Sequence, residues 1–272
     1  MMHVKFWGVR GTTACSSPEY KEFGGHTSCV SIETQNRLIV VDAGTGLFDL
    51  GKWLEGQVYE RANLLLSHVH MDHIAGLPFF RSAWNPNFRL DIYAAHLKKY
   101  GGVKSFLKDQ YAPPFFPVSI DMMTADLSFH DFDCGAEIML EQTVKIQTLP
   151  LNHPNGATGY RINSGDKSVC YISDTEHREG EIDLSIVNFI QGCDLLIYDA
   201  TYTDEQYPAY KGWGHSTWQE GMRIAQLANV KKYAIFHHNP DHADEEMKKI
   251  ERRAMGLWDH CFVARQGQAL IL

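Results

Sequence analysis

Short runs of apolar residues recur along the chain at lengths typical of buried sheet strands. Several of these runs end in a polar or glycine-rich turn, as strands do where they leave a sheet. The pattern predicts strands at residues 4–7, 37–41, 63–66, 90–93, 144–146, 168–172, 194–198 and 233–236.

Helical spacing of apolar residues appears between the later strands. Thr217 and Glu220 form a T-x-x-E capping box, which marks the start of a helix. Apolar side chains then fall three or four positions apart on one face, at Trp218, Met222, Ala225 and Ala228. The spacing therefore predicts a helix that packs on the sheet by this face.

A second helix is predicted from Asp244, which would be its N-cap, to Gly256, where glycine ends it. Its inward face carries Met247, Ile250 and Ala254. The charged residues of the opposite face indicate a solvated surface rather than a binding patch.

The order of the elements, strands first and then strands mixed with helices, predicts a layered α/β protein. No repeat or Pro/Gly/Ser-rich linker interrupts the chain, so we expect one domain over residues 1–272. The segment 82–135 is less regular, and its run 111–117 carries three prolines, which exclude a helix interior or a central strand. This run is either a surface crossover packed on the core or a lid over a substrate.

Composition and charge narrow the class of protein. The 272 residues, 44% of them hydrophobic, can bury a large core, which excludes a mainly disordered chain. The formal net charge is −8. An acidic surface repels phosphate backbones, so we expect no large nucleic acid as a partner.

The chain also carries signals about its compartment. Its start lacks the basic residues, apolar run and cleavage site of a signal peptide, and no apolar run reaches the roughly 18 residues of a membrane span. The six cysteines form no C-x-x-C pair, which indicates reduced thiols rather than a cysteine zinc site. These features predict a cytoplasmic protein with no membrane partner.

One predicted strand runs directly into the motif H-x-H-x-D-H at residues 68–73. Residues two apart in extended backbone face the same way, so His68 and His70 converge on one point. Asp72 and His73 follow where the chain turns and can reach a second point. Imidazole and carboxylate ligands suit divalent metals such as zinc, so the motif predicts a metal site.

Four side chains cannot fill two metal sites, so further ligands must come from other strand ends. Three other strands are followed by residues that can bind a metal: His153, Asp174 and His237. Each is weak evidence alone, but together they supply the ligands that the motif lacks. His238 and His242 follow the last of these strands, and their roles stay open between support of the site and the surface.

These motifs, together with Val41-Asp42-Ala43-Gly44, resemble the metallo-β-lactamase superfamily of dinuclear metallohydrolases over nearly the whole chain. The resemblance implies a four-layer αββα sandwich with the metals at the sheet edge. It also implies two divalent ions as cofactors, with zinc expected and manganese or iron as alternatives.

The resemblance also assigns the metal ligands, which it divides between two ions. It implies that one ion is held by His68, His70 and His153. It implies that the other is held by Asp72, His73 and His237, and that Asp174 bridges the two. Asp42 would support the site from behind rather than bind a metal.

A second pair of motifs indicates a branch of the superfamily. Asp199-Ala200-Thr201 ends one strand, and Gly214-His215-Ser216-Thr217 precedes the capped helix. The pair resembles the phosphodiesterase branch that includes tRNase Z and bacterial cyclic-nucleotide phosphodiesterases. There the histidine faces the substrate phosphate and a carboxylate, often Glu, orients it. The resemblance therefore assigns His215 and Asp199 to catalysis. On chemical grounds Asp72 can also act as a proton acceptor for a metal-bound water.

Three short motifs, and the absence of a tRNA-binding arm, narrow the class of substrate. Residues 8–12, 24–29 and 113–117 resemble a group of compact bacterial enzymes in this branch, although that group usually has Asn at the position of His26. The chain shows no long, basic, glycine-rich arm of the kind with which tRNase Z grips tRNA. We expect a small phosphodiester, a cyclic nucleotide first, attacked by a metal-bound hydroxide. His215 would act as the acid or stabilise the phosphate.

Alternatives stay open. One is a tRNase Z-like 3′-processing nuclease, another is a hydrolase of a lactone, thioester or β-lactam on the same fold, and a third is a non-catalytic binding protein. Phe115, Phe116 and Trp213 either stack a nucleobase or pack in the core or a lid. A homodimer is also open, because related enzymes are often dimers in which the partner helps to close the site.

Overall fold

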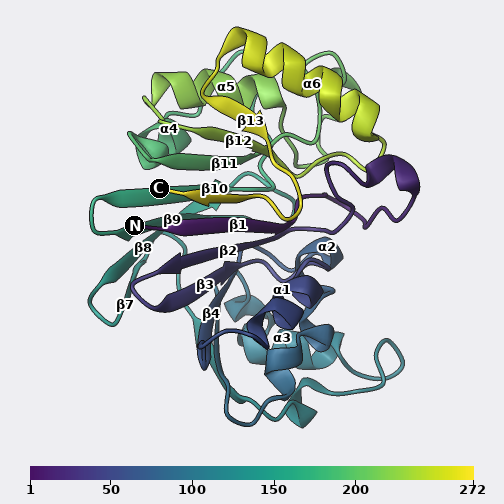
Figure 1. The fold of residues 1–272 in the computed structure, drawn as a ribbon, viewed down its shortest axis with the longest axis vertical. Coiled ribbons are helices and arrows are strands. Elements are labelled where there is room, and N and C mark those ends of the chain that lie inside the picture. Colours follow the sequence, from purple (N-terminus) through teal and green to yellow (C-terminus); the bar gives the residue numbers. More distant parts are fainter.

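A computed structural model describes all 272 residues. Two seven-stranded sheets pack face to face, and helices cover the outer face of each sheet (Figure 1). This arrangement is the predicted αββα sandwich, an α/β fold of four layers. None of its helices has both the length and the apolar character needed to cross a membrane.

The first sheet has the strand order β14-β1-β2-β3-β4-β5-β6. Its strands are β1 (His3–Gly8), β2 (Cys29–Thr34), β3 (Arg37–Val41), β4 (Arg61–Leu66), β5 (Arg89–Ala94), β6 (Asp126–Asp131) and β14 (Ala269–Ile271). Because β14 pairs with β1, the two ends of the chain lie side by side (Figure 1).

The second sheet has the order β13-β12-β11-β10-β9-β8-β7. Its strands are β7 (Glu137–Leu140), β8 (Val144–Leu151), β9 (Ala157–Ser164), β10 (Lys167–Ile172), β11 (Leu195–Asp199), β12 (Tyr233–Phe236) and β13 (Cys261–Val263). Strands β10 to β13 are parallel, as are β3 to β6 in the first sheet. Parallel neighbours bring the ends of several strands to one edge.

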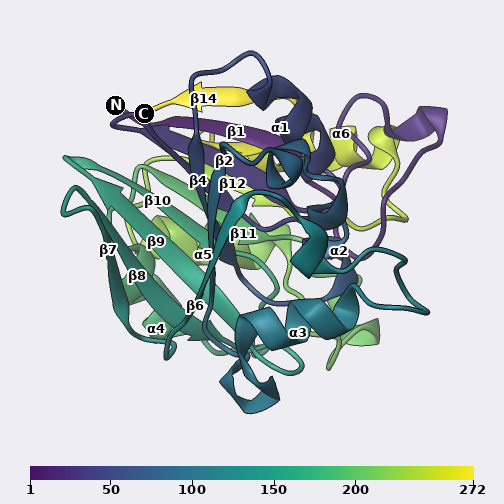
Figure 2. The ribbon, with the colours of Figure 1, turned by 90° about the horizontal axis from the view of Figure 1, so that it is seen from below.

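Helices flank both sheets (Figures 1 and 2). The first sheet is accompanied by α1 (Leu47–Leu54), α2 (Met71–Ile74) and α3 (Gly102–Gln110), and the second by α4 (Leu184–Ile190), α5 (Trp218–Leu227) and α6 (Asp244–Leu257). Short 3-10 helices lie at η1 (Pro18–Tyr20), η2 (Leu77–Phe79), η3 (Arg81–Trp84), η4 (Lys98–Tyr100), η5 (Ile120–Met122) and η6 (Tyr207–Ala209).

The apolar residues form three layers of core. In β4, Leu64 packs under the helices of the first sheet, whereas its neighbour Leu65 lies between the two sheets. In β11, Leu196 packs under the helices of the second sheet and Leu195 lies between the sheets. Strands buried on both faces need continuous apolar runs, which explains the pattern in the sequence. Because both halves of the chain share the middle layer, we propose that residues 1–272 form one domain.

All eight predicted strands are present, and α5 begins as predicted. Thr217 is the N-cap of α5, and its hydroxyl oxygen accepts a hydrogen bond of 3.0 Å from the backbone N–H of Glu220. The prediction for α6 was wrong at both ends, because Asp244 and Gly256 lie inside the helix, and its N-cap and C-cap are Ala243 and Trp258. The Asp244 carboxylate instead accepts hydrogen bonds of 2.9 and 3.1 Å from the N–H groups of Glu22 and Phe23.

The proline-rich run 111–117 contains neither helix nor strand, as predicted. The Tyr111 hydroxyl donates a 2.7 Å hydrogen bond to the carbonyl of Ile74, and the Phe116 ring meets Phe79 edge-on at 5.8 Å. Phe115 is 83% exposed. These contacts favour a crossover packed on the core. The surrounding segment 82–135 is more regular than the sequence pattern indicated, because it holds β5, α3 and β6.

Leu195→Ala should lower the free energy of unfolding by about 2–5 kcal/mol, because it opens a cavity between the sheets. Leu195 is fully buried, whereas Leu227 is 56% exposed at the end of α5. Leu227→Ala is therefore the matched control, with a change below about 0.5 kcal/mol expected in the same denaturant titration. Equal losses in the two variants would contradict the core assignment.

Candidate metal centre

The residues predicted to bind metals gather at one edge of the sandwich, although they come from separate parts of the chain. Three groups of ligand-capable atoms form there, with all atoms of a group within 4.8 Å of one another. The first group is His68, His70 and His153, and the second is Asp72, His73, Asp174 and His237. These two groups contain the seven residues of the sequence prediction. The third group is Asp174, Asp199, His215 and His237, and it shares Asp174 and His237 with the second.

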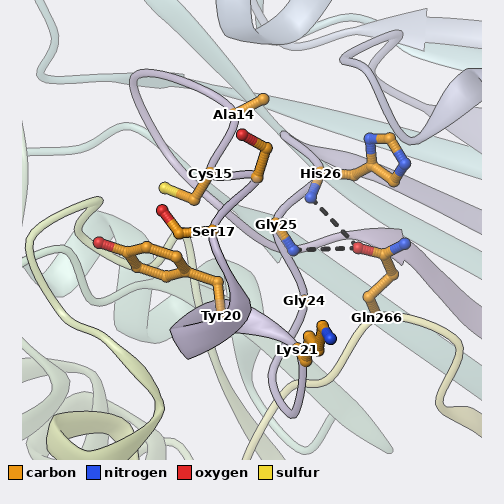
Figure 3. Close-up of a pocket in the computed structure, with 10 residues that line it drawn as sticks. Ala14, Cys15, Ser17, Tyr20, Lys21, Gly24, Gly25, His26 and Gln266 are labelled. Carbon is orange, nitrogen blue, oxygen red and sulfur yellow. Dashed lines mark hydrogen bonds between the residues drawn. The ribbon is translucent and has the colours of Figure 1, made fainter.

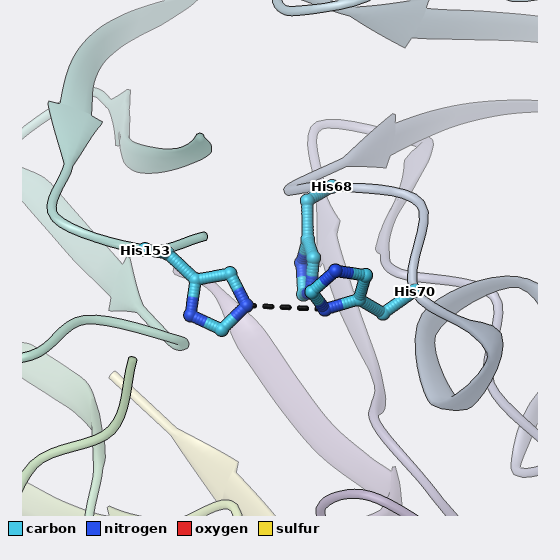
Figure 4. Close-up of side chains that lie close together, drawn as sticks. All are labelled: His68, His70 and His153. Carbon is cyan, nitrogen blue, oxygen red and sulfur yellow. Dashed lines mark hydrogen bonds between the residues drawn. The ribbon is translucent and has the colours of Figure 1, made fainter. Parts of the chain in front are cut away.

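Three histidine rings form the first group (Figure 4). His70 Nδ1 lies 3.0 Å from His68 Nε2 and 3.1 Å from His153 Nε2. His68 and His70 come from the turn after β4, and His153 comes from the loop after β8. Three ring nitrogens aimed at one point fit a single divalent cation bound through their lone pairs.

The second group has tetrahedral spacing. His73 Nε2 lies 3.3 Å from His237 Nε2 and 3.3 Å from Asp72 Oδ2, and His237 Nε2 lies 3.3 Å from Asp72 Oδ2. Asp174 Oδ2 lies 3.1 Å from His73 Nε2 and 3.3 Å from His237 Nε2. Ligand bonds of about 2.0–2.1 Å to zinc give a tetrahedron with edges of about 3.3–3.4 Å. The four donors therefore fit one zinc-sized ion.

Asp174 faces both groups. Its Oδ2 belongs to the second group, while its Oδ1 lies 3.7 Å from His68 Nε2 and 3.9 Å from His153 Nε2. The residue is 1% exposed, so water cannot neutralise its charge there. A carboxylate with one oxygen toward each group is suited to bridge two cations.

The opposite ring nitrogen of most histidines in these groups has a partner behind the site. The Nδ1 atom of His68 lies 3.1 Å from Ser67 Oγ, and that of His73 lies 2.7 Å from Asp42 Oδ2. The Nδ1 atom of His153 lies 2.8 Å from the Gly214 carbonyl oxygen, and that of His237 lies 2.9 Å from Thr201 Oγ1. Such partners fix the tautomer and orient the ring, which leaves Nε2 available as a ligand.

Three residues that support the site were not predicted from the sequence. Thr201 belongs to the D-A-T motif, and Gly11 and Thr12 belong to the G-V-R-G-T motif at residues 8–12. A Cβ at Gly11 would lie 2.3 Å from His237 Cε1, so only glycine leaves room for that ring. The Thr12 N–H donates a 2.7 Å hydrogen bond to Asp72 Oδ2. The available signal was the compact G-V-R-G-T motif, but its partner residues lie far away in the sequence.

His215 and Asp199 form a buried ion pair beside the second group. His215 Nδ1 lies 2.9 Å from Asp199 Oδ2, and the His215 ring stacks on His237 at 5.0 Å. Burial alone would lower the pKa of His215, but the charge and hydrogen bond of Asp199 raise it to about 9. Asp199 therefore favours the protonated imidazole, whose second N–H is free to donate.

A cavity of about 440 Å³ opens onto these groups, and we call it the His215 cavity. His70, Asp72 and His215 line it. Its other wall is aromatic and contains Tyr202, Tyr210 and Trp213, with the two tyrosines stacked at 4.4 Å. Phe115 and Phe116 do not line this cavity, so of the three aromatics predicted for base stacking only Trp213 is in place.

His238 and His242, whose roles the sequence left open, both have structural contacts. His238 Nε2 donates to the carbonyl of Ala264 at 2.8 Å, and His242 Nε2 lies 2.9 Å from the Gln206 amide nitrogen. Neither histidine belongs to a ligand group.

The Gly24–His26 motif shapes a separate surface hollow of about 420 Å³ (Figure 3). There the amide oxygen of Gln266 accepts hydrogen bonds of 3.2 Å from the N–H groups of both Gly25 and His26. A Cβ at Gly25 would lie 1.7 Å from the Cys15 carbonyl oxygen, so this position requires glycine. The motif therefore builds the loop beside the site and does not contribute side chains to it.

An αββα sandwich with two adjoining His/Asp groups at its edge defines the class of metallo-β-lactamase-fold proteins. Residues 37–238 match the family described as the Beta-lactamase superfamily domain, and the chain belongs to this superfamily.

Similar proteins place the chain near one branch of the superfamily. It is 25% identical to the ribonuclease Z of Porphyromonas gingivalis, over 80% of this chain and 85% of that protein. The metallo-β-lactamase fold protein YhfI from Bacillus subtilis has a similar structure, with a TM-score of 0.74, 19% identity and coverage of 99% and 98% of the two chains. A diphosphatase of the PhnP family aligns with a TM-score of 0.71, 18% identity and coverage of 100% and 98%. The tRNase Z-like branch predicted from the motifs is thereby supported.

Thr201→Val should weaken metal binding about 10- to 100-fold, because it removes the hydroxyl that orients His237. The matched control is Thr34→Val, since the Thr34 hydroxyl bonds to Ser164 instead of to the site. Competition with a chelator, followed by metal analysis, measures the change. Unaltered affinity in Thr201→Val would contradict the orienting role.

Proposed function

We propose that this protein is a metal-dependent phosphodiesterase that hydrolyses a small phosphodiester. The observation that carries the proposal is the His215–Asp199 pair, which places a cationic N–H donor beside both ligand groups. A phosphodiester needs this combination, because its hydrolysis develops negative charge on phosphoryl oxygens and on the departing alkoxide.

The seven residues of the two ligand groups would hold two divalent ions, with zinc as the first candidate and manganese or iron as alternatives. Donors that are all nitrogen or carboxylate oxygen fit each of these metals. When bound, the ions would supply Lewis-acid stabilisation of the phosphate and lower the pKa of water for attack. The side chains of this chain would perform the remaining tasks.

His215 donates a proton to the leaving oxygen or braces the phosphoryl group through its free N–H. Asp199 favours the protonated form of the imidazole. Burial raises the pKa of the Asp199 carboxyl, but the charge and hydrogen bond of His215, together with the charge of His237, outweigh burial and lower it. Asp72 is fixed by the Thr12 N–H and faces the cavity, where its carboxylate can accept the proton of the attacking water. Both roles are assigned because His215 and Asp72 line the His215 cavity, where the phosphodiester would bind.

The size and walls of the His215 cavity support a small substrate. Its volume of about 440 Å³ suits a group of nucleotide size, and Trp213 and Tyr210 offer aromatic surface for a base. A cyclic nucleotide is the candidate carried by the resemblance of the motifs. A cytoplasmic location and a homodimer stay predictions of the same kind.

Ribonuclease activity is the second candidate, because curated relatives such as the Porphyromonas gingivalis protein are named ribonuclease Z. This conflicts in part with the expectation that a large nucleic acid is excluded. Against it stand the net charge of −8 and the tight hairpin of β9 and β10, which leaves no room for a basic arm between His153 and Asp174.

His215→Ala should retain close to two metal ions per chain but lose about 10²- to 10⁴-fold in the turnover of a phosphodiester, because it removes the proton donor. His260→Ala serves as the control, since this histidine is exposed at the far side of β13 and should keep full turnover. Metal analysis and steady-state kinetics on the same preparations separate the two effects. Full activity in His215→Ala would disprove its role.

A substrate panel tests the reaction class. We expect the zinc-loaded protein to hydrolyse a generic aryl phosphodiester and at least one cyclic nucleotide, but neither a precursor tRNA nor a β-lactam. Measured rates for the four substrates decide between the candidates. Cleavage of the precursor tRNA at its 3′ end would establish the second candidate, and cleavage of the β-lactam alone would overturn the phosphodiesterase proposal.

A further inference from the structure

A second cavity, of about 300 Å³, adjoins the first ligand group from another side, and we call it the His96 cavity. His68 and His70 line it together with His96, Tyr100 and Phe106. Its remaining wall is the loop 154–156 that follows His153. His70 is shared with the His215 cavity, so the first ligand group stands between two separate spaces.

His96 has hydrogen-bonding capacity that the protein does not use. Both of its ring nitrogens are shielded from solvent and neither has a partner. Because both nitrogens have almost no accessible surface, a group inside the cavity would contact the carbon atoms of the ring. The imidazole therefore adds a flat wall to the cavity rather than a hydrogen-bonding group.

The other walls are suited to a flat group. The rings of Tyr100 and Phe106 lie 6.5 Å apart at an angle of 58°, on the segment formed by η4 and α3. Opposite them, Gly156 has a positive φ of 90°, and a Cβ built there would meet no atom within 4 Å. An apolar aromatic space with one polar residue is a common design for binding a base or an aryl ring.

The position of His215 decides which part of the substrate enters this space. Hydrolysis breaks the bond between phosphorus and the leaving oxygen, adds the oxygen of water to phosphorus and transfers a proton to the leaving alkoxide. The retained alcohol stays on the product as a phosphomonoester. When His215 acts as the proton donor of the proposed function, the leaving alcohol lies in the His215 cavity and the retained group points elsewhere.

We infer that the His96 cavity binds the aromatic ring of the retained ester group, which packs against the rings of His96, Tyr100 and Phe106. This inference rests on the proposed phosphodiesterase function. It predicts a preference for diesters in which the retained alcohol carries an aromatic ring. A cyclic nucleotide carries both ester bonds on one sugar and can fill only one of the two cavities, so we expect it to be hydrolysed more slowly than an aryl diester.

The kinetic test compares two diesters that share the same leaving group, bis(4-nitrophenyl) phosphate and methyl 4-nitrophenyl phosphate. The ratio of kcat/KM for the first diester to kcat/KM for the second reports how well the retained group binds. The two diesters also differ in intrinsic reactivity, but this difference cancels when the ratio in a variant is divided by the ratio in the wild-type protein. The ratio should fall about tenfold in both His96→Ala and Phe106→Ala, because an aromatic contact of this kind is lost. Phe115→Ala, which alters an exposed ring outside both cavities, should keep the ratio.

A binding test separates this inference from the proposed function. Calorimetry on the zinc-loaded protein should show phenyl phosphate binding about tenfold more tightly than methyl phosphate, and His96→Ala should abolish that preference. Hydrolysis of both diesters with unchanged ratios in the two variants would overturn the inference and leave the function standing. A preference lost in Trp213→Ala instead would place the ring in the His215 cavity and also overturn it. If neither diester is hydrolysed, the phosphodiesterase proposal is wrong. The calorimetric preference for phenyl phosphate over methyl phosphate then decides by itself whether the His96 cavity binds an aromatic ring.

Discussion

The buried carboxylate of Asp42 connects the two sheets at the point where the candidate ligands meet. Its oxygens accept hydrogen bonds of 2.7 and 2.8 Å from the N–H and hydroxyl of Ser67, and of 2.7 Å from the Tyr171 hydroxyl. His73 Nδ1 lies 2.7 Å from the same carboxylate. Because Asp42 follows β3 and Tyr171 belongs to β10, the anion joins opposite sheets. A buried charge is tolerated only with such partners, so their positions are fixed with respect to one another.

Backbone conformation adds a second constraint at the same edge. Asp42, Asp174 and His237 all have positive φ values, of 62°, 60° and 57°, just beyond the ends of β3, β10 and β12. Left-handed backbone costs a residue other than glycine about 1–2 kcal/mol. The strained turns direct the side chains back over the edge of the sheet. Strain concentrated at a site of this kind is typical of functional positions that the surrounding structure holds in place.

Much of the fold could be predicted because its signals are local. Runs such as 63–66 and 194–198 are buried on both faces, so their sequence is continuously apolar. Two of the strands that were not predicted lack this signal, because β6 is only partly buried along its length and β14 has three residues. Two others, β2 and β9, are largely buried, but polar residues interrupt their sequences. The error at Asp244 has a different origin, since its carboxylate bonds to backbone about 220 residues away.

In the candidate site, too, local motifs revealed some residues, whereas the roles of others depend on contacts between distant parts of the chain. His68, His70, Asp72 and His73 lie within one short motif, and the other ligands directly follow strands, so spacing and resemblance located them. The contributions of Gly11 and Thr201 depend on contacts with His237, which no local pattern contains. The His96 cavity was equally invisible, because its walls come from the turn after β4, from η4 and α3 and from the loop after β8. Geometry across elements was needed to find each of them.

The origin of each ligand group in both sheets has a consequence for the stability of the whole sandwich. Each ligand group combines side chains that follow β4 in one sheet with side chains that follow strands of the other sheet. A cation in either group is therefore a cross-link between the sheets, closing a chain segment of more than 80 residues between His70 and His153. Any species that binds only the folded state shifts the folding equilibrium toward it in proportion to the logarithm of its concentration. The supply of metal would thus govern how much of this protein stays folded as well as how much of it is active.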